Sequence, residues 1–81
     1  MNLDLRGSTP EQIRAYLESL GGTVRPDGTV AGPDWTATLE AGEHRAFGAV
    51  WPRVIVTFTG DPGAVERVAA GLRLRALRGG G

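Results

Sequence analysis

The stretch VWPRVIVTFTG, residues 50–60, decides the fold of this chain. Alternate side chains of an extended strand point to opposite sides of a sheet, so the two sides can be compared. One side is uniformly apolar and the other is mixed: Val54, Val56 and Phe58 against Ile55, Thr57 and Thr59. The pattern predicts an inner strand of a sheet that is covered on one face.

Two segments on the N-terminal side predict a further strand and a helix. Residues 1–6 alternate in the same way and predict a short strand. A helix start follows, either with Ser8 as N-cap in a capping box with Glu11 or with Thr9 as N-cap before Pro10. Apolar side chains then recur at helical spacing, at Ile13, Tyr16, Leu17 and Leu20. The next two residues are glycines and end the helix.

The middle of the chain predicts more strands. Residues 23–31 predict a compact hairpin, because proline, aspartate and glycine occupy successive turn positions. Residues 35–40 predict a strand with Trp35 on the core side. Residues 41–49 carry two glycines and no sustained period, which favours the longest loop or an irregular edge segment. Pro52 should lie at the first residue or at an edge of the next strand.

The C-terminal segment predicts a second helix. Asp61 is a suitable N-cap before Pro62. One helical face is apolar, at Val65, Val68, Ala69, Leu72 and Ala76. Residues 72–77 also alternate at period two, so a final strand is the competing interpretation there. The order β-α-β-β-β-β-α predicts an α+β fold, in which an antiparallel sheet of four to five strands carries two helices on one face.

The composition of the chain limits which kinds of partner and site it can have. The chain has 81 residues, with nine acidic and nine basic side chains and no cysteine. The balanced charge argues against nucleic acid as a partner, and the missing thiols exclude disulfides and thiolate metal sites. No segment approaches the ~20 apolar residues of a membrane span, so we expect a cytoplasmic protein. One small core leaves sheet surface exposed, which favours a homodimer.

Few residues could carry chemistry. His44 is the only histidine, and a zinc site or a general base needs partners that the sequence does not supply. We therefore expect no catalytic residue, no metal and no cofactor, and a protein that is not an enzyme. The candidate binding residues are His44, Phe47, Trp51, Ile55 and Thr57. A small molecule bound between the sheet and residues 41–49 is one hypothesis for this surface.

The last three residues, Gly79, Gly80 and Gly81, are expected to form a flexible tail after a single domain of residues 1–78. The preceding Leu-Arg-Leu-Arg sequence looks like the ending of ubiquitin, where a diglycine lets the terminal carboxylate enter the adenylation site of an activating enzyme. This resemblance implies an alternative function as a sulfur carrier or protein modifier activated at Gly81. The β-grasp fold of such carriers begins with a hairpin, whereas here a helix follows the first strand.

Several segments resemble the C-terminal domain of bacterial MoaD-related proteins, which are related to the small subunit of molybdopterin synthase. The resemblance rests on Tyr16-Leu17-Glu18 before Gly21-Gly22-Thr23, on Trp51-Pro52-Arg53-Val54-Ile55-Val56, and on Arg78-Gly79-Gly80-Gly81. It implies a fold similar to half of a TATA-binding-protein-like saddle, and an association with molybdenum cofactor biosynthesis or sulfur-carrier proteins. The leading hypothesis is a non-enzymatic accessory module whose partner is a MoaD-like protein or an E1-like activating enzyme.

Overall fold

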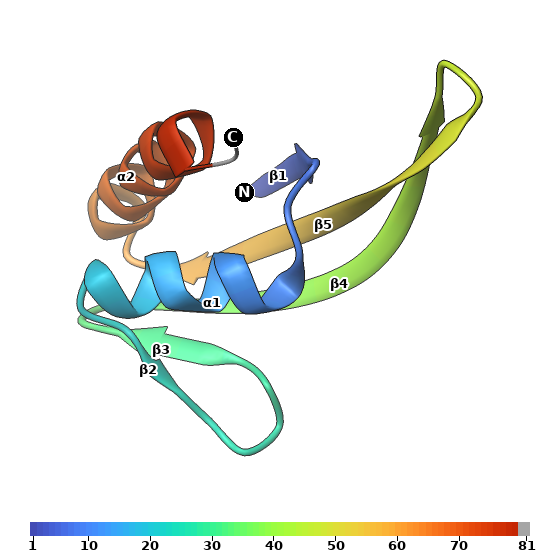
Figure 1. Ribbon diagram of the computed structural model, residues 1–81. Helices are drawn as coiled ribbons and strands as arrows, with labels where there is room; N and C mark the ends of the chain where they lie inside the picture. The colour runs from blue at the N-terminus through green and yellow to red at the C-terminus, as the bar shows by residue number, and fades with distance from the viewer. Residues whose placement is uncertain (80–81) are drawn as a thin grey trace.

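The computed structural model describes residues 1–79 and has the predicted α+β fold (Figure 1). Its elements are β1 (Asn2–Arg6), α1 (Pro10–Ser19), β2 (Thr23–Val24), β3 (Val30–Gly32), β4 (Trp35–Ala46), β5 (Ala49–Gly60) and α2 (Pro62–Gly79). The five strands form one sheet in the order β1-β5-β4-β3-β2, with antiparallel neighbours. β5 is therefore an inner strand, which confirms the prediction from residues 50–60.

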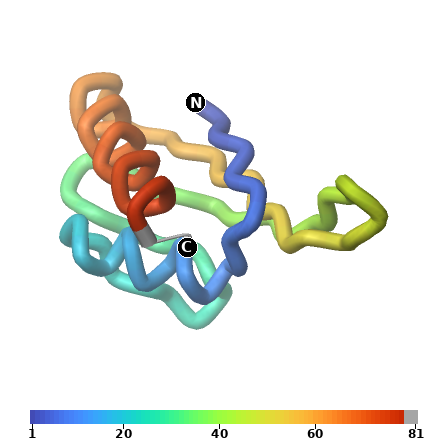
Figure 2. Tube along the Cα trace, turned by 45° about the horizontal axis from the view of Figure 1, so that its top comes forward, coloured from blue at the N-terminus to red at the C-terminus, as the bar shows by residue number. Residues whose placement is uncertain are grey.

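Both helices lie on one face of the sheet, as predicted (Figure 1, Figure 2). The core between the two layers contains residues predicted from the sequence: Ile13, Leu17, Trp35, Val54, Val56, Phe58, Val65, Val68, Ala69 and Leu72. The rings of Trp35 and Phe58 meet edge to face, with centroids 6.3 Å apart and an interplanar angle of 71°. Each large apolar side chain buried in this way contributes about 1.5–3 kcal/mol.

Both helices begin at side-chain caps. The Thr9 hydroxyl accepts a hydrogen bond from the Gln12 N–H at 3.3 Å, and the Gln12 side chain accepts one from the Thr9 N–H at 2.9 Å. The Thr9 alternative is thus confirmed. The capping box of Ser8 is wrong, because that side chain is buried before the helix begins. At α2, Asp61 accepts a hydrogen bond from the Ala64 N–H at 2.9 Å and is the predicted N-cap.

α2 continues through the segment where a strand was the competing interpretation. Residues 72–77 are helical, and Leu72 is fully buried as part of the predicted apolar face. The helix is described through Gly79, the first residue of the predicted tail. Gly80 and Gly81 lie outside the described residues, so the flexible tail stays a prediction.

Residues 41–49, predicted as a loop or an irregular edge segment, instead complete a long β-hairpin. β4 and β5 have 12 residues each and stay paired as far as Ala46 and Ala49. Phe47 and Gly48 connect them with φ values of 54° and 73°. Positive φ at both central residues is typical of the type I′ turn, which suits the twist of a hairpin. The loop prediction is wrong because this part of the hairpin has no buried face to impose a period.

Pro52 lies inside β5, at an edge of the sheet. It pairs with Glu43 of β4, and its carbonyl oxygen accepts a hydrogen bond from the Gly7 N–H at 2.7 Å, on the side away from β4. The missing N–H of Pro52 would point to the same side, toward Gly7 just beyond the end of β1, so the ladder between β4 and β5 loses no bond there. The predicted edge placement is confirmed, and the placement at the first residue of the strand is wrong.

Candidate functional site

The outer part of the β4–β5 hairpin, residues 43–52, extends beyond the other strands and forms a two-stranded arm (Figure 1). β1 pairs with β5 only as far as Arg53, and β3 pairs with β4 only from Trp35 to Ala37. Figure 2 shows the arm projecting from the layers of helix and sheet. We call residues 43–52 the arm and the other described residues the body.

The tip of the arm exposes large apolar side chains. Phe47 is 102% exposed, while Val50 and Trp51 are 53% and 47% exposed. Phe47 also has a left-handed backbone conformation, which costs a residue with a side chain about 1–2 kcal/mol. The ring gains no burial within the chain to offset that cost. An exposed aromatic of this kind is typical of an interface anchor.

The structure brings three predicted binding residues together on the arm. His44 and Trp51 are directly paired across the two strands. They line an open hollow of about 250 Å³ with Arg6, Gly7, Ala46 and Phe47. The Trp51 indole N–H donates to the Ala46 carbonyl oxygen at 3.4 Å, which holds the ring against the arm. This open hollow replaces the site that was predicted between the sheet and a loop.

The other two predicted binding residues, Ile55 and Thr57, lie in the body, on the face of the sheet that the helices leave uncovered. Both are half-buried. Ile55 has Asp4 as its neighbour on β1 and Glu40 as its neighbour on β4. Neither Ile55 nor Thr57 lines the open hollow at the arm. The five predicted binding residues therefore do not form a single site.

An ion pair lies where the arm joins the body. The Arg53 guanidinium donates to both carboxylate oxygens of Asp4 at 2.8 Å, and Arg6 approaches the same carboxylate at 3.6 Å. The hydrogen bonds from Arg53, helped by the charges of both arginines, hold the pKa of Asp4 below its ordinary value. The pair ties Asp4 of β1 to Arg53, the residue of β5 at which its pairing with β1 ends.

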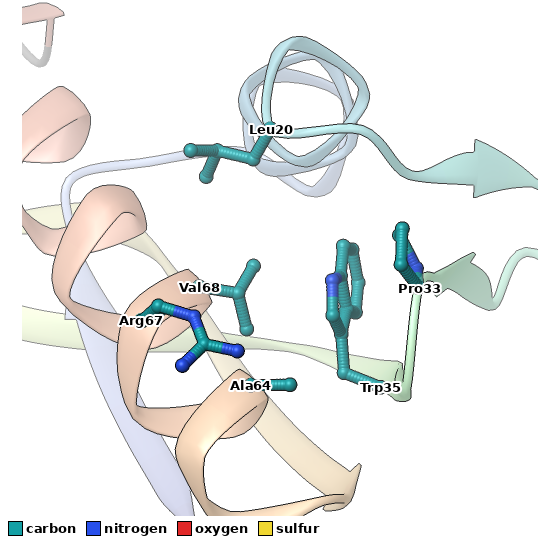
Figure 3. Close-up of a pocket in the computed structure, with 6 residues that line it drawn as sticks. All are labelled: Leu20, Pro33, Trp35, Ala64, Arg67 and Val68. Carbon is teal, nitrogen blue, oxygen red and sulfur yellow. The ribbon is translucent and has the colours of Figure 1, made fainter.

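A second hollow lies at the end of the hairpin opposite the arm (Figure 3). It measures about 250 Å³ and is lined by Leu20, Pro33, Trp35, Ala64, Arg67 and Val68. Figure 3 shows that these residues come from α2, the C-terminal cap of α1, the start of β4 and the turn before it. The sequence did not predict this hollow, because its lining residues come from segments far apart in the chain and no local pattern indicates that such segments meet.

Metal sites and membrane-spanning helices are two further features to consider in the described residues. In residues 1–79 there is no group of three or more histidine, cysteine, aspartate or glutamate side chains that could hold a metal ion. No helix in the described part of the chain is long and apolar enough to cross a membrane. Among the surfaces described above, the arm joins exposed aromatic side chains to a hollow.

Comparison with known proteins gives a family match. A family model described as archaeal MoaD-like protein matches residues 1–81. No curated protein matches the chain. The family match supports the MoaD-related part of the resemblance seen in the sequence. The match does not support the two finer points of that resemblance, which were a bacterial origin and a position as the C-terminal domain of a longer protein.

Proposed function

The chain belongs to the archaeal MoaD-like protein family, and on this premise we propose that it is a non-enzymatic accessory module that binds a protein partner through its arm. The partner acts in molybdenum cofactor biosynthesis or in a sulfur-carrier pathway in the cytoplasm. One observation carries the proposal: Phe47 is fully exposed at a turn position that does not suit it.

The conformational cost of Phe47 in the turn and the free energy gained by burying its ring together favour a binding role for this residue. Asparagine or glycine would form this turn more easily, and phenylalanine costs about 1–2 kcal/mol there. Burying a phenylalanine side chain is worth about 1.5–3 kcal/mol. Within the chain that gain is absent, because the ring is fully exposed. In a pocket of a partner the gain would exceed the cost, so the residue suits a contact outside the chain.

The first partner to test is a MoaD-like sulfur carrier. In the proteins that the sequence resembles, a domain of this kind follows a ubiquitin-type sulfur-carrier domain. A contact between the two kinds of domain would then be formed either within one chain or between two chains. An E1-like activating enzyme, which handles such carriers, is the second partner to test.

The experiment is isothermal titration calorimetry of the full chain with a purified MoaD-like carrier and with an E1-like enzyme. Phe47→Asn removes the ring but suits the turn, so the arm remains folded. We expect this variant to weaken binding by about tenfold or more. Leu74→Asn is the matched control, because Leu74 is an exposed apolar residue on α2, away from the arm. Equal affinity of wild type and Phe47→Asn, or no binding to either protein, would refute the proposal.

A sulfur carrier or protein modifier activated at Gly81 is the alternative, which the family description also favours. Two features speak against it. α1 follows β1 directly, without the initial hairpin of a β-grasp carrier. Leu72, the first residue of the ubiquitin-like sequence, is buried within a helix instead of lying in an extended tail. Incubation with an E1-like enzyme and ATP, followed by intact mass spectrometry, separates the two functions. The terminal carboxylate of a carrier would displace pyrophosphate from ATP and form an adenylate, and added sulfide as the sulfur donor would then displace AMP and form a thiocarboxylate. An accessory module forms neither.

A further inference from the structure

We propose that β1 pairs edge to edge with β1 of a second copy of this chain, in antiparallel orientation, so that the two sheets become continuous. The inference goes beyond the binding function of the arm and rests on different residues. β1 and β2 are the two edges of the sheet. β2 has two residues, whereas β1 has five and no proline, so β1 offers the longer and more regular row of backbone groups.

The outward backbone groups of β1 belong to its even-numbered residues, Asn2, Asp4 and Arg6. The Met1 carbonyl oxygen accepts a hydrogen bond from β5 at 2.8 Å, and the Gly7 N–H donates one to β5 at 2.7 Å. The odd-numbered residues therefore turn their backbone toward β5. The alternation of an antiparallel ladder directs the N–H and C=O groups of the even-numbered residues to the free edge. That edge can accept another strand without breaking an existing ladder bond.

A register centred on Asp4 makes the two edges complementary. Asn2 then faces Arg6 of the second copy across hydrogen-bonded positions. On the helix side of the sheet, Leu3 faces Leu5 of the second copy, so apolar residues meet apolar residues. All three outward residues of each strand find partners in this register. A shift by two residues would leave one of them without a partner.

Charges also favour this register. Each Asp4 faces its own equivalent, which would be repulsive for two unpaired carboxylates. Here each carboxylate already accepts two hydrogen bonds of 2.8 Å from Arg53 and has Arg6 of its own chain at 3.6 Å. Pairing adds Arg6 of the second copy as a diagonal neighbour. The two arginines of its own chain are thus closer to each Asp4 than the like charge across the seam.

A hollow with both apolar and charged lining residues flanks the same edge. It measures about 350 Å³ and lies between β1 and α2, with Leu5 and Arg6 on one side and Arg73, Ala76 and Leu77 on the other. Leu77 is 83% exposed although it borders this hollow. The twofold axis of such a strand pair is perpendicular to the sheet, so the α2 helices of both copies lie on the same side. Leu77 of each copy then covers the seam between the two β1 strands.

The experiment is analytical ultracentrifugation of the full chain over a dilution series. Asn2→Pro removes one outward N–H while the Met1 carbonyl bond to β5 is kept, and Leu77→Asp places a charge at the seam without touching the core. We expect each variant to raise the dissociation constant of the dimer by about tenfold or more. Leu74→Asp, an exposed residue of the same helix that does not line the hollow, should leave the dimer intact.

Three outcomes overturn the inference. The first is a wild-type chain that is monomeric at every concentration. The second is a dimer that neither Asn2→Pro nor Leu77→Asp weakens. The third is a dimer that Phe47→Asn abolishes while Asn2→Pro and Leu77→Asp leave it intact. Circular dichroism of Leu77→Asp verifies folding, because this exposed side chain contributes little to the monomer. Phe47→Asn should remain dimeric even if it no longer binds the protein partner of the arm. Failure of the dimer inference can therefore be distinguished from failure of the proposed function.

Discussion

The two halves of the β4–β5 hairpin are formed by the same strands but are stabilised differently. In the body, one face of β5 packs under the helices, and Val54, Val56 and Phe58 are buried. In the arm, no residue from 43 to 52 is buried. The arm is held by its backbone ladder and by its turn, together with the ion pair at its base. A two-stranded ribbon without a packed face is marginally stable in water.

The difference shows which part of the hairpin is available for binding. Aromatic side chains in the body already contribute their burial to folding, and a partner could not contact them without disrupting the core. Aromatic side chains on the arm contribute little to folding and keep their apolar surface for a contact outside the chain. The body therefore supports the arm, and the arm presents the binding residues.

The two phenylalanines of the chain give the largest expected contrast. Phe58 is 2% exposed and meets Trp35 edge to face, whereas Phe47 is fully exposed. Phe58→Ala should lower the free energy of unfolding by about 3–5 kcal/mol, through lost burial and the cavity that remains. Phe47→Ala should change it by less than about 1 kcal/mol. Urea unfolding followed by circular dichroism measures both, and similar losses at the two positions would contradict the division into body and arm.

Two glycines give a smaller contrast, between the packed part of the body and its boundary with the arm. A Cβ atom at Gly32 would overlap the ring of Trp35, whereas a Cβ at Gly42, at the base of the arm, would have its nearest neighbour 4.0 Å away. Gly32→Ala should therefore destabilise the body by about 1–3 kcal/mol through overpacking. Gly42→Ala should stay within about 0.5 kcal/mol of wild type. Thermal unfolding of the two variants measures this difference, and a large loss at Gly42 would reveal packing at the boundary where the arm begins.

The body could be predicted from the sequence because a buried face imposes a visible period. Residues 54–59 alternate since one side faces the helices, and Leu72 continues the apolar face of α2. The arm could not be predicted in this way, because residues 41–49 have no buried side chain and hence no period. Its turn also lacks the usual signal, since Phe47-Gly48 stands where Asn-Gly or Asp-Gly would indicate a type I′ hairpin.

The candidate site was predicted in part. His44, Phe47 and Trp51 stand out within a segment without a period, and the structure gathers them around one hollow. Ile55 and Thr57 were grouped with them because alternation gives the face on which a residue lies. Alternation does not show how far along the strand a residue lies from the hairpin turn. It therefore could not show that Ile55 and Thr57 lie in the body and not in the arm. Long-range contacts, such as the hollow between β1 and α2, leave no local pattern in the sequence.

The smallest effect is expected at the boundary between body and arm, where Arg53 binds Asp4. Arg53 lowers the pKa of Asp4 in the folded chain, first through its hydrogen bonds and then through its charge. A carboxyl group with a lowered folded-state pKa adds stability above its unfolded-state pKa, and this stability is lost as the pH falls through the folded-state pKa. Arg53→Gln should therefore be slightly less stable than wild type at neutral pH, and the two should converge in strong acid.

The same variant should raise the pKa of Asp4 toward its ordinary value of 3.8, which NMR titration of the carboxyl carbon measures. Arg6→Gln is the matched control and should raise it less, because Arg6 lies farther from the carboxylate, at 3.6 Å. The pair is exposed to solvent, so its effect on global stability is small. Its local effect is sharper: amide hydrogen exchange in the arm should be faster in Arg53→Gln at neutral pH, while exchange in the body is unchanged. Unchanged exchange in the arm would show that the ladder and the turn hold the arm without help from the ion pair at its base.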